Sequence, residues 1–495
     1  MRKNGYESAV RVIGAAALTG WLLCAAAPAS SQDGAPRLQG QVPLADQMSG
    51  RALAGYSQHV KLVGHNNILN RLQNGNLGWL DDCAYVAAYY GASDPTAGLA
   101  ILDVSKPKNP RLTGILPGIP GTRESQVEAN ADSRVVIVMT FPTTTYFGDP
   151  PAPNSLLKIY EPVGDCTNLV LRGTYDYGKE AGQTIVTHEH LIWRDKVYAT
   201  VTSPTAPGPS LSVVDISDKA SPALITTWDL SDEAGMPASA IHDLHVSPDG
   251  TRAYVNLWTP RLGVGNGGAE VGLAILDTSE VAAWKSGMPR PTIRRISRII
   301  YWGPPMPGNS HSTQLVKIKG RKYVLTENEG ASGAPDNQCP GGWAQIIDVN
   351  DELNPTVISS FRLEVSKPEN CPITLPDHNG IPTSGPVSIL QNGIRYSTHY
   401  LGVDDPESAK IAAFTWYSSG LWLVDISDPY KPKEVGYFIP PAINIGGPRS
   451  YPDRAYSYVR FHQGNIWFVS INGGFWVVKL TGQNKSADAG ETDSE

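Results

Sequence analysis

Charged side chains are scarce in this chain of 495 residues, because Asp, Glu, Lys and Arg together make up only 18% of it. A typical soluble protein has about 25%. The charges sum to −7, which excludes the broad basic surface of a general nucleic-acid-binding protein. Glycine and proline are abundant instead, at 49 and 40 residues, and they disfavour helices. A helical bundle and a coiled coil are therefore excluded, and the 41% of hydrophobic residues excludes a disordered chain.

The chain also lacks an apolar run long enough to span a membrane. The longest run covers residues 12–27, about 16 residues, whereas a spanning helix needs ~20. Arg2, Lys3 and Arg11 precede this run, and Ala27 and Ala29 provide the small residues of a cleavage site. We therefore expect residues 1–29 to be a secretory signal peptide. The mature protein would be periplasmic or secreted, without stable insertion into a membrane.

One short pattern recurs along the sequence: an apolar residue, a small or polar one, two apolar ones and a carboxylate. It reads LAILD (99–103), LKIYE (157–161), LSVVD (211–215), LAILD (273–277), AQIID (344–348) and LWLVD (421–425), with a degenerate last copy, FWVVK (475–479). The β-branched and aromatic residues favour a strand in each copy. Because the closing residues lie 54 to 77 residues apart, the pattern indicates a repeat architecture.

Each copy of the pattern lies between two kinds of neighbouring strand. A hairpin precedes it, most clearly at residues 246–258, where Asp249 and Gly250 form the reversal. A turn rich in Asp, Ser and Pro follows, such as DVSKPKNP after the first copy, and leads into a further strand. Each repeat therefore predicts four antiparallel strands, which form one blade of a β-propeller.

The seven copies predict an all-β fold, a seven-bladed β-propeller of four-stranded antiparallel blades over residues 56–482. The last blade lacks an outer strand of its own, and residues 59–65 would supply it, so that N- and C-terminal strands close the ring. Residues 30–55 are expected to be a flexible N-terminal segment and residues 483–495 a disordered tail. The alternative, two separate β domains, is disfavoured because no linker interrupts the repeats.

The cores LAILDVSKP, LSVVDISDK and LWLVDISDP resemble the LVIVD repeat, which is found in exported bacterial β-propeller proteins. The resemblance covers roughly residues 56–480. It implies the propeller fold but almost nothing about function, because most members of the family have no assigned activity. Glu161 and Lys479 replace the closing Asp in the second and seventh copies.

Four cysteines remain after the predicted leader: Cys83, Cys166, Cys339 and Cys371. An even number in an exported protein suggests two disulfides, and four cysteines allow three pairings. We favour Cys339 with Cys371, because they flank the same repeat core, and Cys83 with Cys166 follows by elimination. Free, buried cysteines are the alternative. No CxxC motif is present, so a cysteine-based zinc site is not expected.

Histidines gather at one point of the repeat, the start of the strand that would line the central channel. Seven of the ten histidines lie there: His188, His190, His242, His245, His311, His378 and His399. The second blade has Glu124 in this region. We expect His188, His242 and His311 to converge at one mouth of the channel, with His378 or His399 as a fourth member. His188 and His190 are two apart and would share a face of their strand.

Neutral imidazoles are good ligands for zinc, copper and iron. The seven histidines are therefore candidate metal ligands, with iron, copper or zinc as the cofactor, and His188, His242, His311 and Glu124 are candidate catalytic residues. In type only, the pattern resembles the all-histidine sites of carotenoid-cleaving oxygenases and of selenium-binding-protein-like thiol oxidases. The sequence thus favours a metal-dependent oxidoreductase with a small organic substrate at the channel mouth. The alternatives are a metal-free propeller that binds a ligand or a cell-surface protein, and histidines with a purely structural role.

Overall fold

The computed structural model of the protein describes residues 38–71, 73–88, 96–119, 122–142, 154–181, 186–202, 211–229, 240–258, 272–301, 309–329, 339–380, 394–444 and 447–481. The predicted signal peptide, residues 1–29, and the predicted tail, residues 483–495, lie outside this set. Among the described residues, no helix has the length and apolar character that crossing a membrane requires.

Antiparallel sheets follow one another along the chain. The first two consist of β3 (Asn74–Leu80), β4 (Cys83–Ala88), β5 (Gly98–Asp103) and β6 (Arg111–Pro117), and of β7 (Thr122–Asn130), β8 (Val135–Pro142), β9 (Leu156–Pro162) and β10 (Leu169–Asp176). The backbone pairing between these two sheets is limited to Ala88 opposite Glu124. The next two consist of β11 (Val186–Trp193), β12 (Lys196–Thr202), β13 (Leu211–Asp215) and β14 (Ala223–Trp228), and of β15 (Ala240–Val246), β16 (Arg252–Trp258), β17 (Gly272–Asp277), β18 (Arg294–Arg295) and β19 (Ile300–Tyr301).

The C-terminal half of the chain continues this arrangement. Its sheets consist of β20 (Asn309–Ile318), β21 (Arg321–Glu329), β22 (Ala344–Asp348) and β23 (Thr356–Phe361), then of β24 (Leu401–Val403), β25 (Ile411–Thr415), β26 (Leu421–Asp425) and β27 (Lys433–Ile439), and finally of β28 (Arg460–His462), β29 (Asn465–Ser470) and β30 (Gly474–Leu480). The described helices are short: α1 (Leu44–Ser49), α2 (Tyr177–Ala181), α3 (Ser279–Ala283), α4 (Cys371–Thr374) and the 3₁₀ helices η1 (Arg51–Ala54), η2 (Ile68–Asn70), η4 (Glu364–Ser366), η5 (Pro368–Asn370) and η6 (Leu375–His378).

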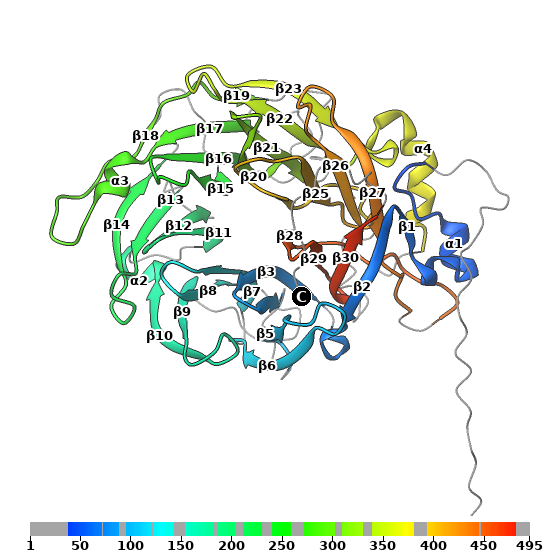
Figure 1. The fold of residues 1–495 in the computed structure, drawn as a ribbon, viewed down its shortest axis with the longest axis horizontal. Coiled ribbons are helices and arrows are strands. Elements are labelled where there is room, and N and C mark those ends of the chain that lie inside the picture. Colours follow the sequence, from blue (N-terminus) through cyan, green and yellow to red (C-terminus); the bar gives the residue numbers. More distant parts are fainter. Residues whose placement is uncertain are drawn as a thin grey trace, which may run out of the picture. The chain divides into compact units, whose positions relative to one another are not determined.

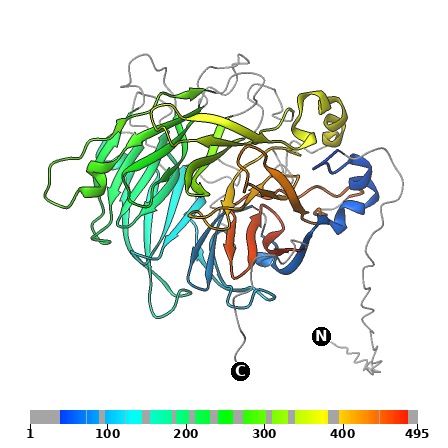
Figure 2. The ribbon, with the colours of Figure 1, turned by 45° about the horizontal axis from the view of Figure 1, so that its top comes forward.

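The sheets lie side by side around a common centre, with the first strand of each sheet inside and the last strand outside (Figure 1; Figure 2). This arrangement is a β-propeller. Clusters of buried apolar side chains fill the spaces between neighbouring sheets, such as the cluster that Ile137 and Ile159 form with Val197 and Val214. The fold is therefore all-β, as the repeats predict, and the first strands of the sheets surround the propeller axis.

The repeat cores form the third strand of each sheet. These strands, such as β13 and β26, are buried along nearly their whole length, because neighbouring sheets cover both of their faces. The closing Asp begins the turn that follows: Asp103 accepts hydrogen bonds from the backbone N–H of Ser105, at 3.0 Å, and from its hydroxyl, at 2.6 Å. Glu161, which replaces Asp, pairs instead with Arg172 and Lys219.

Strands from the N-terminal end of the described chain join the last two sheets. β2 (Val60–Asn66) pairs with β30, from Val60 opposite Leu480 to Asn66 opposite Phe475. β1 (Tyr56–Gln58) pairs with β27. The sequence predicts the first of these pairings.

Residues 44–54, which the sequence analysis assigns to a flexible segment, form α1 and η1 in the structure. Buried polar contacts hold this region against the chain around η6. Asp377 accepts hydrogen bonds from the Gln41 side chain at 2.8 Å and from the Leu44 N–H at 2.9 Å. The Arg449 guanidinium donates to the side-chain oxygen of Gln47, with Nε 3.0 Å from Oε1. The sequence pattern does not reveal these contacts, because they join residues more than 300 positions apart.

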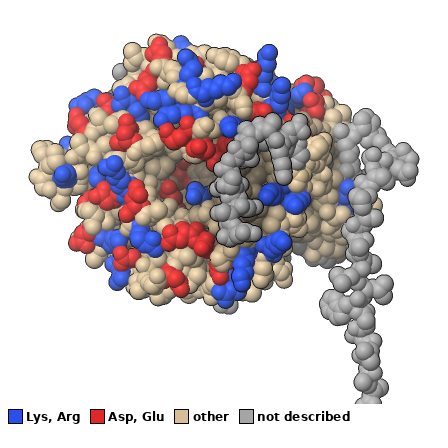
Figure 3. Space-filling view, in the orientation of Figure 1, with Lys and Arg blue, Asp and Glu red and all other residues tan. Residues whose placement is uncertain are grey.

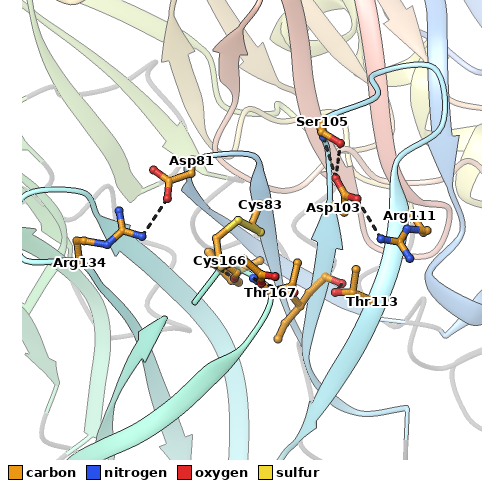
Figure 4. The surroundings of a disulfide bond; sticks show 12 residues. Asp81, Cys83, Asp103, Ser105, Arg111, Thr113, Arg134, Cys166 and Thr167 are labelled. Atoms are coloured by element: carbon orange, nitrogen blue, oxygen red, sulfur yellow. Dashed lines mark hydrogen bonds and ion pairs between the residues drawn. A yellow bond between two sulfur atoms is a disulfide. The ribbon is translucent and has the colours of Figure 1, made fainter. Parts of the chain in front are cut away.

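Two disulfides are present, Cys83–Cys166 and Cys339–Cys371. Both are the pairs that the sequence analysis favours. Cys83 begins β4 and Cys166 precedes β10, so the first disulfide joins neighbouring sheets (Figure 4). An ion pair between Asp81 and Arg134, at 3.1 Å, links the same two sheets.

Candidate metal centre

The inner strands of three consecutive sheets share one irregularity. The register with the second strand shifts between Thr187 and His190 in β11, between Ile241 and Leu244 in β15, and between Ser310 and Thr313 in β20. Such a bulge inserts an extra residue and re-aims its side chain. His188, His242 and His311 are each the first residue of the irregularity, so all three lie at the same place in their sheets.

The imidazole rings of these histidines form a continuous arc. The ring centroids are 4.2 Å apart for His188 and His242, and 3.9 Å apart for His242 and His311. His399, just before β24, extends the arc, with its ring centroid 4.5 Å from that of His311. His242, His311 and His399 are at most 3% exposed. The structure therefore brings together the three histidines expected at one channel mouth, with His399 as the fourth.

The remaining candidate histidines lie elsewhere. His190 and His245 line a cavity of about 500 Å³, which the inner strands surround. His190 does not accompany His188, because the bulge interrupts the alternation of side chains along β11. His378, in η6, packs edge-on against Tyr396, with centroids 5.9 Å apart.

Glu124 begins the corresponding irregularity of β7, where the register shifts between Arg123 and Gln126. It is fully buried in β7, and its carboxylate pairs with the Lys158 ammonium group of β9. Its neighbour Arg123 reaches the cluster instead, since Arg123 Nη2 lies 3.4 Å from His188 Nε2. Glu124 therefore lies at the same place in its sheet as the three histidines, with its carboxylate on Lys158.

Two carboxylates accompany the imidazoles. Glu189 Oε1 lies 3.2 Å from His188 Nδ1, and Glu329 Oε2 lies 3.7 Å from His311 Nε2. In two groups, His188 with Glu189 and His242, and His242 with His311 and Glu329, the potential ligand atoms all lie within 4.8 Å of one another. The histidine pattern does not point to Glu329, because this residue comes from the end of the second strand, β21, rather than from an inner strand.

Glu329 is held in place by two donors. Arg395 Nη1 and the Tyr417 hydroxyl each donate to Glu329 Oε1 at 2.5 Å. Burial alone would raise the pKa of Glu329, but Arg395 and the nearby imidazoles outweigh burial and lower the pKa to about 2. The carboxylate is therefore ionised at neutral pH.

The imidazoles are neutral at the same pH. Burial, with Arg123 as a second cause, lowers the pKa of His188 to about 3, and burial lowers the pKa of His399 to about 3. Burial and the neighbouring rings hold the pKa values of His242 and His311 well below their usual value. Neutral imidazoles beside an ionised carboxylate are the donors that a transition metal ion requires.

A layer of hydrogen-bonded acids and tyrosines lies against the imidazoles. Glu189 accepts hydrogen bonds from Tyr400 and Gln126, and Asp243 Oδ2 accepts one from the Tyr458 hydroxyl at 2.9 Å. Burial raises the pKa of Glu189 to about 8. Glu189 and Tyr458 also line the cavity of about 500 Å³, so this layer separates the imidazoles from the cavity.

The cavity belongs to the interior of the propeller, because inner strands from β3 to β28 contribute to its lining. The face of the molecule seen in Figure 3 is hollowed near its centre, and acidic side chains gather there.

Thr200, on β12 opposite the bulge of β11, fixes the local backbone. Its hydroxyl accepts a hydrogen bond from the Glu189 N–H at 2.9 Å and donates one to the His242 carbonyl at 3.2 Å.

Three segments match the family model of the LVIVD repeat: residues 82–116, 207–229 and 416–439. They include β4 to β6, β13 with β14, and β26 with β27. With its sheets arranged around one axis, the molecule belongs to the β-propeller class. The chain is a β-propeller protein that carries LVIVD repeats, as the sequence resemblance implies.

A comparison with curated proteins found no match. Similar solved structures include the β-propeller domain of Cps50 (Swd1) from Myceliophteria thermophila, with 8% identity and a TM-score of 0.46, covering 85% of this chain and 100% of that chain. A hypothetical selenium-binding protein from Sulfolobus tokodaii has 11% identity and a TM-score of 0.47, covering 83% and 84%. Hydrazine synthase from Kuenenia stuttgartiensis has 13% identity and a TM-score of 0.41, covering 72% and 84%. These likenesses carry no argument about function.

Proposed function

We propose that the imidazole cluster is the metal centre of an exported oxidoreductase that acts on a small organic substrate. His242, His311 and Glu329 would hold the metal ion, and His188 and His399 would flank it. The observation that carries this proposal is the arc of neutral imidazoles from neighbouring sheets beside one ionised carboxylate. We leave Glu124 outside the proposed centre, because its carboxylate pairs with Lys158.

The neighbouring groups would orient the ligands. His399 Nδ1 lies 2.6 Å from the Tyr456 carbonyl oxygen, which favours a proton on Nδ1 and leaves Nε2 as the lone-pair nitrogen. Arg395 and Tyr417 hold Glu329 toward His311. The donor set suits iron, copper or zinc, and bound iron or copper would supply the electron exchange with the substrate.

We also infer that the propeller has seven blades and that β2 closes the ring. In β10, the register shifts before Gly173, and a Cβ at this glycine would lie 2.0 Å from the Lys219 carbonyl oxygen in the next sheet. In β2, the register shifts before Gly64, and a Cβ there would lie 2.1 Å from the Pro107 carbonyl oxygen in the β3–β6 sheet. β2 thus contacts the next sheet as an outer blade strand does, which supports closure between the chain ends.

Export to the periplasm or the medium is the location that we propose. The two disulfides support it, because disulfides persist in oxidising compartments. A second candidate function is a metal-free propeller that binds a small molecule or a cell-surface protein. The cavity of about 500 Å³ favours this candidate, because cavities of this size hold small ligands.

Elemental analysis of the purified protein separates the two functions. The metal-centre proposal expects close to one iron, copper or zinc ion per chain. The double variant His242→Ala/His311→Ala should lose the metal and the oxidoreductase activity. The control variant His59→Asn should keep both, because His59 is exposed and asparagine tolerates its positive φ of 55°. A wild-type protein without stoichiometric metal after growth with all three ions would contradict the proposal.

A further inference from the structure

The channel mouth has two chemically different sides. The imidazoles come from the sheets of β11, β15, β20 and β24. In β3, the same register irregularity lies between Asn74 and Leu77, and its first residue is Gly75, which has no side chain. β3 therefore adds no imidazole to the arc.

Guanidinium groups stand at both ends of the imidazole arc. At one end, Arg123 Nη2 lies 3.4 Å from His188 Nε2, and Arg123 Cζ lies 4.8 Å from the centre of the Phe141 ring. At the other end, Arg454 Cζ lies 5.9 Å from the centre of the Tyr417 ring, which is 4.4 Å from the His399 ring. Arg454 is only 4% exposed.

Acidic side chains near the imidazole arc already accept hydrogen bonds from other side chains. Glu329 is held by Arg395 and Tyr417, Glu189 by Tyr400 and Gln126, and Glu124 by Lys158. Aromatic rings lie beside Arg123 and Arg454 and limit the orientations of their guanidinium planes. A planar guanidinium matches the two oxygens of a carboxylate.

We propose that the substrate of the metal centre is a small organic carboxylate, which Arg123 and Arg454 bind through its carboxylate group while its organic part lies over the imidazoles. This inference rests on the proposed function, because it assigns a substrate class to the same site. It does not require the arginines to lack other partners, because an incoming carboxylate adds acceptors for the charged guanidinium groups of Arg123 and Arg454.

Calorimetric titration with benzoate and with its neutral amide, benzamide, tests the substrate class. The wild-type chain should bind benzoate at least tenfold more tightly than benzamide. Arg123→Gln and Arg454→Gln should each weaken benzoate binding at least tenfold and leave benzamide binding unchanged. Arg294→Gln is the matched control. Arg294 lies on the outer strand β18 and pairs with Glu280, so this substitution should not change benzoate binding.

Equal affinity for benzoate and benzamide would overturn the inference, as would unchanged benzoate binding in both arginine variants. Sulfate that displaces benzoate at equal concentration would also overturn the carboxylate class. If a glutamine variant does not fold, Arg123→Lys keeps the charge without the planar fork and should bind benzoate with intermediate affinity. Metal content is measured on the same samples. Stoichiometric metal without a preference for benzoate refutes the inference alone, and a preference for benzoate without metal refutes the metal-centre proposal alone.

Discussion

At the scale of single residues, Glu329 is the group on which the proposed metal centre depends most. Its ionised carboxylate is held by Arg395 and Tyr417, and its second oxygen lies 3.7 Å from His311 Nε2. Taking a charge out of water is costly, so a residue of this kind is retained where the charge has a partner or a role. In the proposed centre, the charge of Glu329 offsets that of the metal ion.

Glu329→Gln should therefore lower the affinity for the metal at least tenfold, because the amide keeps the size of the side chain but not its charge. Competition with a chromogenic chelator measures this affinity. Glu407→Gln is the control, since Glu407 forms an exposed ion pair with Lys317 and should leave metal binding unchanged. Equal metal affinity in Glu329→Gln and the wild type would remove Glu329 from the centre.

His245 gives a second prediction at this scale. Burial lowers its pKa from 6.5 to about 4. Between pH 6.5 and about 4, the unfolded chain binds a proton at this residue and the folded chain does not, so acidification over this range reduces the stability of the folded state.

His245→Gln should remove this loss. Its free energy of unfolding, relative to that of the wild type, should increase as the pH falls from 6.5 to 4 and stay constant from pH 7 to 8. Denaturant titrations of the metal-free proteins at a series of pH values measure the difference. Parallel stability curves down to pH 4 would show that folding does not lower the pKa of His245.

At the scale of elements, the bulges of the inner strands create the site. The repeat cores and the hairpins before them predict the strands, because their alternation and turn residues are local signals. The bulges are not local in this sense, because each depends on the register with a second strand. For this reason the sequence brings His188, His242 and His311 to one region but does not separate His188 from His190.

Thr200 connects two of these elements, and its role is testable. Its buried hydroxyl binds the Glu189 N–H of β11 and the His242 carbonyl of β15. Thr200→Val keeps the shape but leaves these groups unsatisfied, so it should cost about 1–3 kcal/mol of stability. It should also weaken metal binding, because the hydroxyl no longer holds the backbone next to His188 and at His242 in place. Thr200→Ser retains the hydroxyl and should restore the metal affinity of the wild type. A valine variant with normal stability and metal content would show that the bulges need no such support.

At the scale of the whole molecule, the propeller holds the imidazole arc only while neighbouring sheets stay in contact. The imidazoles come from separate sheets, each of which contributes one or two side chains. Closing the ring fixes the spacing between all sheets at once, because no sheet edge is left to open. The outer strands that meet the next sheet contain glycine at corresponding places, as in KLVGHN of β2 and VLRGTY of β10. In the proposed closed ring, this shared motif would mark β2 as the outer strand of the last sheet.

Gly64→Ala tests this closure. The added Cβ would lie 2.1 Å from the Pro107 carbonyl oxygen, so β2 and the β3–β6 sheet would have to separate. We expect a loss of about 1–3 kcal/mol of stability, as for other overpacked sites. Gly114→Ala, in β6, is the matched control: a Cβ there meets nothing within 4 Å, and its effect should stay within about 0.5 kcal/mol. Thermal and denaturant unfolding of both variants measure the difference.

If the ring is closed where β2 meets the β3–β6 sheet, Gly64→Ala should also reduce metal binding, because strain at the closing contact would change the spacing of the sheets that carry the imidazoles. Equal stability of the two variants would mean that the contact between Gly64 and Pro107 does not hold the ring together.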